Sequence, residues 1–98
     1  MLQVIYRAAA EFELREAYNW YEEREPGLGS EFMRSVDGCI QLICRHPEIF
    51  PIVRKDIRQA VVRRFPYSIF HLPTKEKIIV LSVFHASRKP KKWFRSES

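Results

Sequence analysis

The chain has 98 residues, the length of a single domain, and its apolar content of 46% is typical of a globular protein rather than a disordered one. Its charge is divided unevenly: residues 1–50 carry five Lys or Arg and nine Asp or Glu, a net −4, whereas residues 51–98 carry twelve and three, a net +9. With only three glycines, the sequence has no nucleotide-binding glycine loop. No apolar run approaches the roughly 20 residues of a membrane span, which argues against a transmembrane helix. The absence of a CxxC pair or a Cys/His cluster argues against a structural zinc site.

The first half of the chain has the pattern of two helices. A short apolar run at 2–6 predicts an opening strand. Apolar residues then recur at helical spacing over 8–25 and again over 30–45, with Ser30 as the expected N-cap of the second helix. The intervening Pro-Gly-Leu-Gly segment, 26–29, ends the first helix and lets the chain reverse.

The second expected helix contains a glycine and both cysteines. Gly38 either costs about 1 kcal/mol relative to alanine or allows the first helix to approach closely. Cys39 and Cys44 point roughly 140° apart around the helix axis, so a disulfide between them would break the helix. We therefore expect free, buried thiols, and with the absence of a signal-peptide pattern this favours a cytoplasmic protein.

The pattern changes from helical to extended after Pro47. The expected extended segments are 49–53, 57–65, 67–72 and 78–85, joined by turns at 55–56 and 73–77. The order β-α-α-β-β-β predicts an α+β fold, with two consecutive antiparallel helices packed on one face of a small, mainly antiparallel sheet of four or five strands. The basic residues are expected on the other face.

We interpret residues 1–98 as one domain with a basic C-terminal tail at 87–98. The expected core consists of the apolar side chains on the helix-facing stripes and in the last strand. These are Leu14, Ala17, Tyr21, Val36, Ile40, Ile43, Ile79, Leu81 and Val83. The basic half contains the strands, so its charge forms a folded surface, which attracts nucleic acid, the ribosome or an acidic protein.

Four motifs in this order resemble the RelE/ParE superfamily of toxins from bacterial toxin–antitoxin systems. They are Trp20-Tyr21-Glu22-Glu23 with Pro-Gly-Leu-Gly at 26–29, the segments 46–51 and 63–67, and the segment 83–93. Together they span nearly the whole chain. The most specific parts are Phe65-Pro66-Tyr67 and the final strand running into H-x-x-R-x-P.

The resemblance implies a RelE/ParE-like fold and one of two mechanisms. RelE-like members cleave messenger RNA in the ribosomal A site without a metal, whereas ParE-like members poison DNA gyrase. Both kinds are held inactive by a partner antitoxin, in systems of the plasmid-stabilisation type. The motifs here look more like those of the ParE-type branch. No cofactor or metal is implied.

The candidate site residues test this choice. Metal-independent RNA cleavage needs a base, an acid and cations around one phosphate. The candidates for that chemistry are His85, Arg64 and Arg88, and no tyrosine follows Tyr67, where RelE-like members would carry one. A simpler interpretation of His85 is a hydrogen bond that ties the strand end to the tail. A complete acid–base set is not evident, which favours a protein that acts by binding over an enzyme.

The expected target-binding surface is made of cations in the second half and one aromatic anchor. It comprises Arg58, Arg63, Arg64, Arg88, Lys89, Lys91, Lys92 and Trp93. Arg63 and Arg64 cannot both face one side of a strand, so one is expected on the open side and the other at an edge or paired with an acid on the helices. The lysines have a simpler interpretation as a solvated tail.

The sequence therefore predicts a ParE-like toxin that poisons DNA gyrase and forms a hetero-oligomer with a cognate antitoxin. The alternative is a RelE-like, ribosome-dependent messenger RNA endonuclease on the same scaffold. A weaker alternative is a nucleic-acid-binding module without toxicity. Charge alone does not separate them, because a basic surface serves all three.

Overall fold

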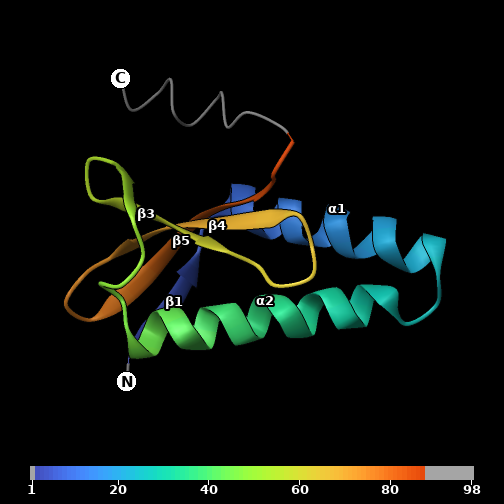
Figure 1. Cartoon of the computed structure of the whole chain (residues 1–98), viewed down its shortest axis with the longest axis horizontal. Coiled ribbons are helices and arrows are strands. Elements are labelled where there is room, and N and C mark those ends of the chain that lie inside the picture. Colours follow the sequence, from blue (N-terminus) through green and yellow to red (C-terminus); the bar gives the residue numbers. More distant parts are fainter. Residues whose placement is uncertain (1, 88–98) are drawn as a thin grey trace.

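In the computed structural model, which describes residues 2–87, two antiparallel helices cover one face of a five-stranded sheet (Figure 1). In chain order the elements are β1 (Gln3–Tyr6), α1 (Ala8–Arg24), α2 (Leu28–Arg45), β2 (Ile52–Arg54), β3 (Ile57–Val61), β4 (Tyr67–Pro73) and β5 (Lys77–His85). The strand order is β1-β5-β4-β3-β2, with β1 parallel to β5 and the other neighbours antiparallel. The predicted α+β fold is confirmed.

The turn between the helices differs from the sequence prediction. α2 begins at Leu28, and its N-cap is Gly27 in the left-handed conformation (φ 92°), not Ser30. The carboxylate of Glu22 in α1 accepts hydrogen bonds from the main-chain N–H groups of Gly27 and Gly29, both at 2.9 Å. The Glu22 side chain thus accepts the hydrogen bonds that a serine N-cap usually accepts from the first amides of a helix. As a result, α2 begins at Leu28, two residues before the start predicted from the sequence.

The close approach of the helices occurs at Gly29, not at Gly38. A Cβ atom on Gly29 would lie 2.8 Å from the Tyr18 carbonyl oxygen, whereas one on Gly38 would meet nothing within 4 Å. Gly38 is exposed, so the proposed packing role for it is wrong.

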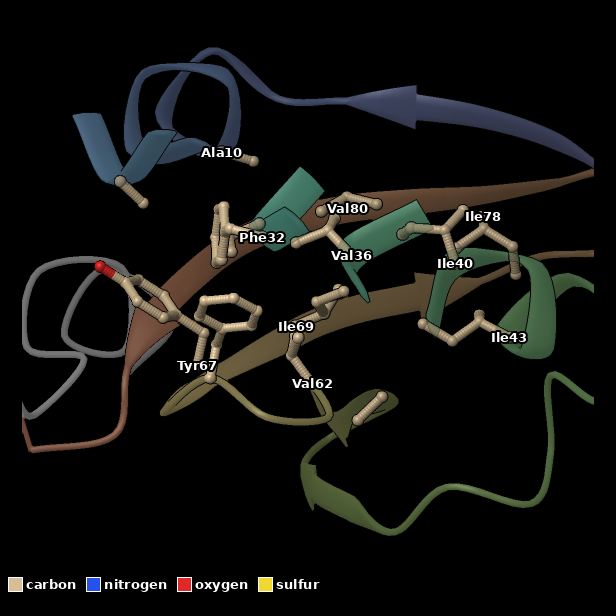
Figure 2. Packing of buried hydrophobic residues seen from close by; sticks show 14 of the residues in the cluster. Ala10, Phe32, Val36, Ile40, Ile43, Val62, Tyr67, Ile69, Ile78 and Val80 are labelled. Carbon is tan, nitrogen blue, oxygen red and sulfur yellow. The ribbon is translucent and has the colours of Figure 1, made fainter. Parts of the chain in front are cut away.

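The core lies between the helices and the sheet. From α2, Phe32, Val36, Ile40 and Ile43 project towards the strands, and Figure 2 shows them facing Ile69, Ile78 and Val80. All seven of these side chains are buried. Their spacing of three and four residues along α2 places them on one stripe, which explains why the helical prediction held.

A β-bulge changes which residues of β5 reach this core. Ser82 lies opposite Phe70 and Val80 lies opposite the next residue of β4, His71, so Leu81 is the extra residue on β5. Ile78 and Val80 before the bulge, and Val83 after it, join the core. Ile79 and Leu81 are only half-buried, and so is Leu14 in α1. The predicted burial of these three residues was too high. For Ile79 and Leu81 the reason is the bulge, which interrupts the alternation in β5, whereas Leu14 packs against the margin of the core from α1.

One end of the core is aromatic. Tyr21 of α1 packs against Phe32, Phe65 and Tyr67, with ring centroids 5.0–6.3 Å apart. β3 ends at Val61, and the following residues form a bend instead of the expected strand up to Phe65. Phe65 and Tyr67 are both buried, so this bend is anchored against the helices beside the end of β5.

Candidate functional site

The edge of β5 is covered by two different elements. β1 pairs with its first half, as far as Tyr6 opposite Val80. Beyond that point α1 takes the place of a strand: the Glu13 carboxylate accepts hydrogen bonds from the Val83 N–H at 2.9 Å and from the Ser82 hydroxyl at 2.8 Å. Because Ser82 is fully buried, this contact satisfies a polar group that burial would otherwise make costly.

A groove of about 440 Å³ lies where α1 faces the ends of β4 and β5. The wall from α1 includes two carboxylates, Glu13 and Glu16, and two aromatic side chains, Phe12 and Trp20. The opposite wall includes Pro66, Tyr67, Val83, Phe84 and His85. Phe12 is 57% exposed and Trp20 is 49% exposed, so the α1 wall presents aromatic surface to the solvent.

His85 lies in this groove at the end of β5. Its Nδ1 accepts a hydrogen bond from the Ser87 N–H at 3.1 Å and lies 2.7 Å from the Ser87 hydroxyl oxygen. The ring packs edge-on against Tyr67, with centroids 5.2 Å apart. The expected hydrogen bond between the strand end and the following segment is present. In the neutral ring, acceptance at Nδ1 leaves the proton on Nε2.

Arg58 lies at the other end of the sheet. It is opposite His71 in the β3–β4 ladder, whereas His85 is opposite Tyr67, four residues further along β4. That separation corresponds to roughly 13 Å along a strand. The Arg58 guanidinium donates to the Phe50 carbonyl at 2.7 Å and to the Glu48 carbonyl at 3.1 Å, and so ties the loop after α2 to β3.

Arg63 and Arg64 lie in the bend between β3 and β4. Arg64 has a left-handed backbone (φ 73°), and its guanidinium forms an ion pair with Glu31 of α2 at 2.9 Å. Of the two adjacent arginines, this is the one that pairs with an acid on the helices, an arrangement expected from the sequence. Arg63 is exposed. Arg58 and Arg64 therefore contact different elements, the loop after α2 and α2 itself, and neither contact involves His85.

The remaining predicted site residues lie outside the described residues. They are Arg88, Lys89, Lys91, Lys92 and Trp93. Among residues 2–87, no group of three His, Cys, Asp or Glu side chains is placed to hold a metal ion. Within the same range, no helix is long and apolar enough to cross a membrane.

The sequence interpretation missed the groove wall formed by α1. Phe12, Glu16 and Trp20 recur every fourth residue, so they share one face of the helix. That spacing was a usable signal. The Trp20 ring contacts Tyr21 edge-on, and the Arg24 guanidinium lies 3.7 Å from its centroid. Its exposure could not be read from the pattern, because it depends on where β4 and β5 end.

Comparison with solved structures places this helical hairpin and sheet among the RelE/ParE-type toxin folds. The chain is similar to a protein of the chromosomal ParDE toxin–antitoxin system from P. aeruginosa, with a TM-score of 0.69, 14% identity, and coverage of 89% of this chain and 98% of that one. It is also similar to the isolated E. coli RelE toxin, with a TM-score of 0.66, 18% identity, and coverage of 99% and 97%. At these identities the likeness shows the fold.

The sequence itself places the chain in a family. The model of the ParE toxin of type II toxin–antitoxin systems, parDE, matches residues 4–90, so the chain belongs to the ParE toxin family. No curated protein sequence matches it significantly. The resemblance to the ParE-like branch is confirmed.

Proposed function

We propose that this protein is a toxin that binds and poisons DNA gyrase and that a cognate antitoxin neutralises it. Membership of the ParE toxin family supports the toxin–antitoxin role. The observation that carries the choice of gyrase over RNA cleavage is the separation of His85 from Arg58 and Arg64, the described arginines whose contacts are defined. Arg58 is held by the loop carbonyls at one end of the sheet, and Arg64 is paired with Glu31, while His85 faces α1.

RNA cleavage by the 2′-hydroxyl requires a base, an acid and cations around one phosphate, and each proton transfer contributes about 10²–10⁴-fold to the rate. Cations that point to separate elements cannot meet this requirement, but they can contribute to a broad binding surface. On this proposal the target-binding residues are Arg58, Arg63, Arg64, Arg88, Lys89, Lys91, Lys92 and Trp93.

A ribosome-dependent, metal-independent messenger RNA endonuclease is the second candidate. One observation favours it: His85 and two carboxylates, Glu13 and Glu16, line the same groove, so titratable groups are close to one another. The exposed Glu16 carboxylate would, however, repel the phosphate on which such a reaction occurs. This makes the endonuclease the weaker proposal.

The purified protein tests the target. Wild type is expected to inhibit the supercoiling of relaxed plasmid by gyrase and to leave messenger RNA on ribosomes intact. Arg88→Glu and truncation after Ala86 should abolish inhibition, while His85→Gln should retain most of it. Lys75→Glu is the matched control, because Lys75 is an exposed cation in the β4–β5 turn. Cleavage of ribosome-bound messenger RNA that is lost in His85→Gln would support the endonuclease instead.

Expression in cells tests neutralisation. The protein alone should arrest growth with DNA-damage signalling and filamentation while translation continues at first. Co-expression with the protein from the adjacent reading frame should restore growth, and association should slow as salt increases, because the basic half attracts an acidic partner. Growth without arrest and absence of binding would contradict the toxin–antitoxin role.

A further inference from the structure

We infer that Glu31 and Arg64 are positioning residues for target binding. Their ion pair holds the bend between β3 and β4, residues 62–66, in the conformation that presents Arg63 to an acidic surface of gyrase. The inference rests on the proposed function for the identity of the target, and it divides the roles of two adjacent arginines: Arg63 contacts the target, and Arg64 acts through Arg63. Glu31 is not among the site residues that the sequence predicted.

Two neighbouring residues of α2 hold two neighbouring residues of the bend. The Arg64 guanidinium donates a hydrogen bond to the Glu31 carboxylate at 2.9 Å. The next residue of the bend, Phe65, packs edge-on against Phe32, the next residue of α2, with ring centroids 5.3 Å apart. Both rings are buried. The aromatic contact therefore anchors the bend to α2, and the ion pair is a second attachment that limits rotation about that anchor.

The backbone of the bend is unusual at Arg64. Its φ of 73° lies in the left-handed region, which residues other than glycine seldom adopt and keep only where the surroundings hold them. Main-chain hydrogen bonds fix the bend on both sides: the Val62 N–H donates to the Tyr67 carbonyl at 2.9 Å, and the Tyr67 N–H donates to the Phe65 carbonyl at 2.8 Å. Glycine would adopt this conformation without strain, so an arginine here indicates that its side chain has a role. The contact with Glu31 supplies that role.

Arg63 is the exposed cation next to this fixed position. Val62 before it is buried, and so is Phe65 at the far side of the bend. The charge of Arg64 is already compensated by Glu31, whereas Arg63 lies open to an anionic partner. A guanidinium binds a carboxylate through two parallel hydrogen bonds, and this geometry requires a defined direction of approach. A bend with two attachments to α2 provides it.

Exchange of the two charges separates positioning from contact. Glu31→Arg and Arg64→Glu should each raise the concentration needed for half-inhibition of gyrase supercoiling by about five- to tenfold, because attraction within the pair becomes repulsion. The double variant, with the acid in the bend and the cation on α2, should return to within about twofold of wild type, since the two sites are coupled. Asp37→Arg is the matched control, because it reverses the charge of another exposed acid of α2.

Neutral variants test the same coupling without repulsion. Glu31→Gln and Arg64→Gln should weaken inhibition to a similar extent, and the double variant should be no weaker than either single one. Arg63→Gln should weaken inhibition by at least about tenfold, as expected for a central interface residue, and should make it less sensitive to salt. Arg64→Gln should leave the salt sensitivity as in wild type, because it removes no contact with the target.

Hydrogen exchange measures the bend directly. The Val62 amide, which is bonded to the Tyr67 carbonyl, should exchange faster in Arg64→Glu and should return to the wild-type rate in the charge-exchanged double variant. Growth arrest in cells compares the same variants independently of the target, and urea unfolding shows that each is folded.

The possible failures are distinguishable. A double variant as weak as Arg64→Glu would mean that Arg64 contacts the target itself, and full activity of Arg63→Gln would mean that Arg63 does not. Either result would overturn the inference and leave the proposed function standing. If wild type arrests growth without inhibiting gyrase, the proposed target is wrong, and the pattern of growth arrest among the variants decides the positioning role. Absence of growth arrest by wild type would contradict both.

Discussion

The Glu13 carboxylate in α1 accepts a hydrogen bond from the main-chain N–H of Val83 in β5, at 2.9 Å. The same Oε1 atom also accepts from the Ser82 hydroxyl at 2.8 Å. A helix side chain thus occupies the place of a neighbouring strand along the half of β5 that β1 does not reach. This contact holds the strand end that carries His85 and forms one side of the groove.

Glu13→Ala is expected to destabilise the protein by about 2–4 kcal/mol, because hydrogen bonds to a charged group contribute about 1.5–3 kcal/mol each and Ser82 would keep a buried, unsatisfied hydroxyl. Urea unfolding measures the effect. Glu16→Ala provides the control, because Glu16 is an exposed residue of the same helix. The unfolding free energy of this variant should differ little from that of wild type. Equal effects of the two substitutions would show that the Glu13 contact is unimportant.

Gly29→Ala and Gly38→Ala should change stability in opposite directions. A methyl group at Gly29 would lie 2.8 Å from the Tyr18 carbonyl oxygen, which belongs to the backbone and cannot move aside easily, so the hairpin should be destabilised. At Gly38 there is open space within the helix, so alanine should stabilise the protein by about 0.5–1 kcal/mol. Thermal unfolding of the pair measures both. Stabilisation by Gly29→Ala would contradict the close helix approach.

The bulge in β5 separates Val83 from Leu81, two residues that the sequence predicted to share the core. Val83→Ala should cost about 2–3 kcal/mol because its side chain is 1% exposed within the core. Leu81→Ala should cost only about 1 kcal/mol because Leu81 is half-buried outside that core. Denaturant unfolding compares the two. A larger loss in Leu81→Ala would mean that the alternation continues through the bulge.

The same bulge shows how far the sequence could predict the fold. The helices followed from apolar residues at spacings of three and four, because the stripe from Phe32 to Ile43 faces the sheet. In β5 the burial of Val83 followed, but that of Ile78 and Val80 did not, because a single extra residue at Leu81 inverts the alternation before it and leaves no mark in composition. The start of α2 was missed for a similar reason, since Glu22 supplies from a distance the acceptor that was sought at Ser30.

The candidate site was predictable to a smaller extent. His85 was identified from its place at the end of the last strand, and the structure does put it at the groove. The role of Glu13 could not be found, because its contact with Val83 joins residues 70 positions apart. For Arg58, the charge suggested a role in target binding. Its hydrogen bonds to the main-chain carbonyls of Glu48 and Phe50 could not be predicted, because they depend on how the loop after α2 folds back onto β3.

Cys39 should be a slow nucleophile in the folded protein. Burial raises the pKa of its thiol from an ordinary 9.0 to about 11, so at pH 8 the reactive thiolate should be about 100-fold scarcer than in the unfolded chain. Iodoacetamide labelling followed by mass spectrometry, in a Cys44→Ala background, measures the rate with and without urea. Similar rates in both conditions would show that Cys39 is accessible and its pKa ordinary.

His71 should make the protein less stable in mild acid. Its side chain is 0% exposed, its Nδ1 lies 3.2 Å from the Ile69 carbonyl oxygen, and its Nε2 has no partner among the described residues. Burial lowers the pKa of His71 below the ordinary 6.5; the contact with the Ile69 carbonyl opposes this shift, and the charge of Arg58 adds to it. The folded protein therefore holds a neutral ring where the unfolded chain takes up a proton.

The stability contributed by this neutral ring is complete above pH 6.5 and is lost as pH falls from there towards the folded-state pKa of His71. Over that interval the unfolding free energy should decrease by up to about 1.4 kcal/mol per pH unit from this group. Urea unfolding between pH 7.5 and 4.5 measures the slope, which should become shallower in His71→Leu and stay the same in the exposed-site variant His46→Gln. An unchanged slope in His71→Leu would assign the acid sensitivity to other groups.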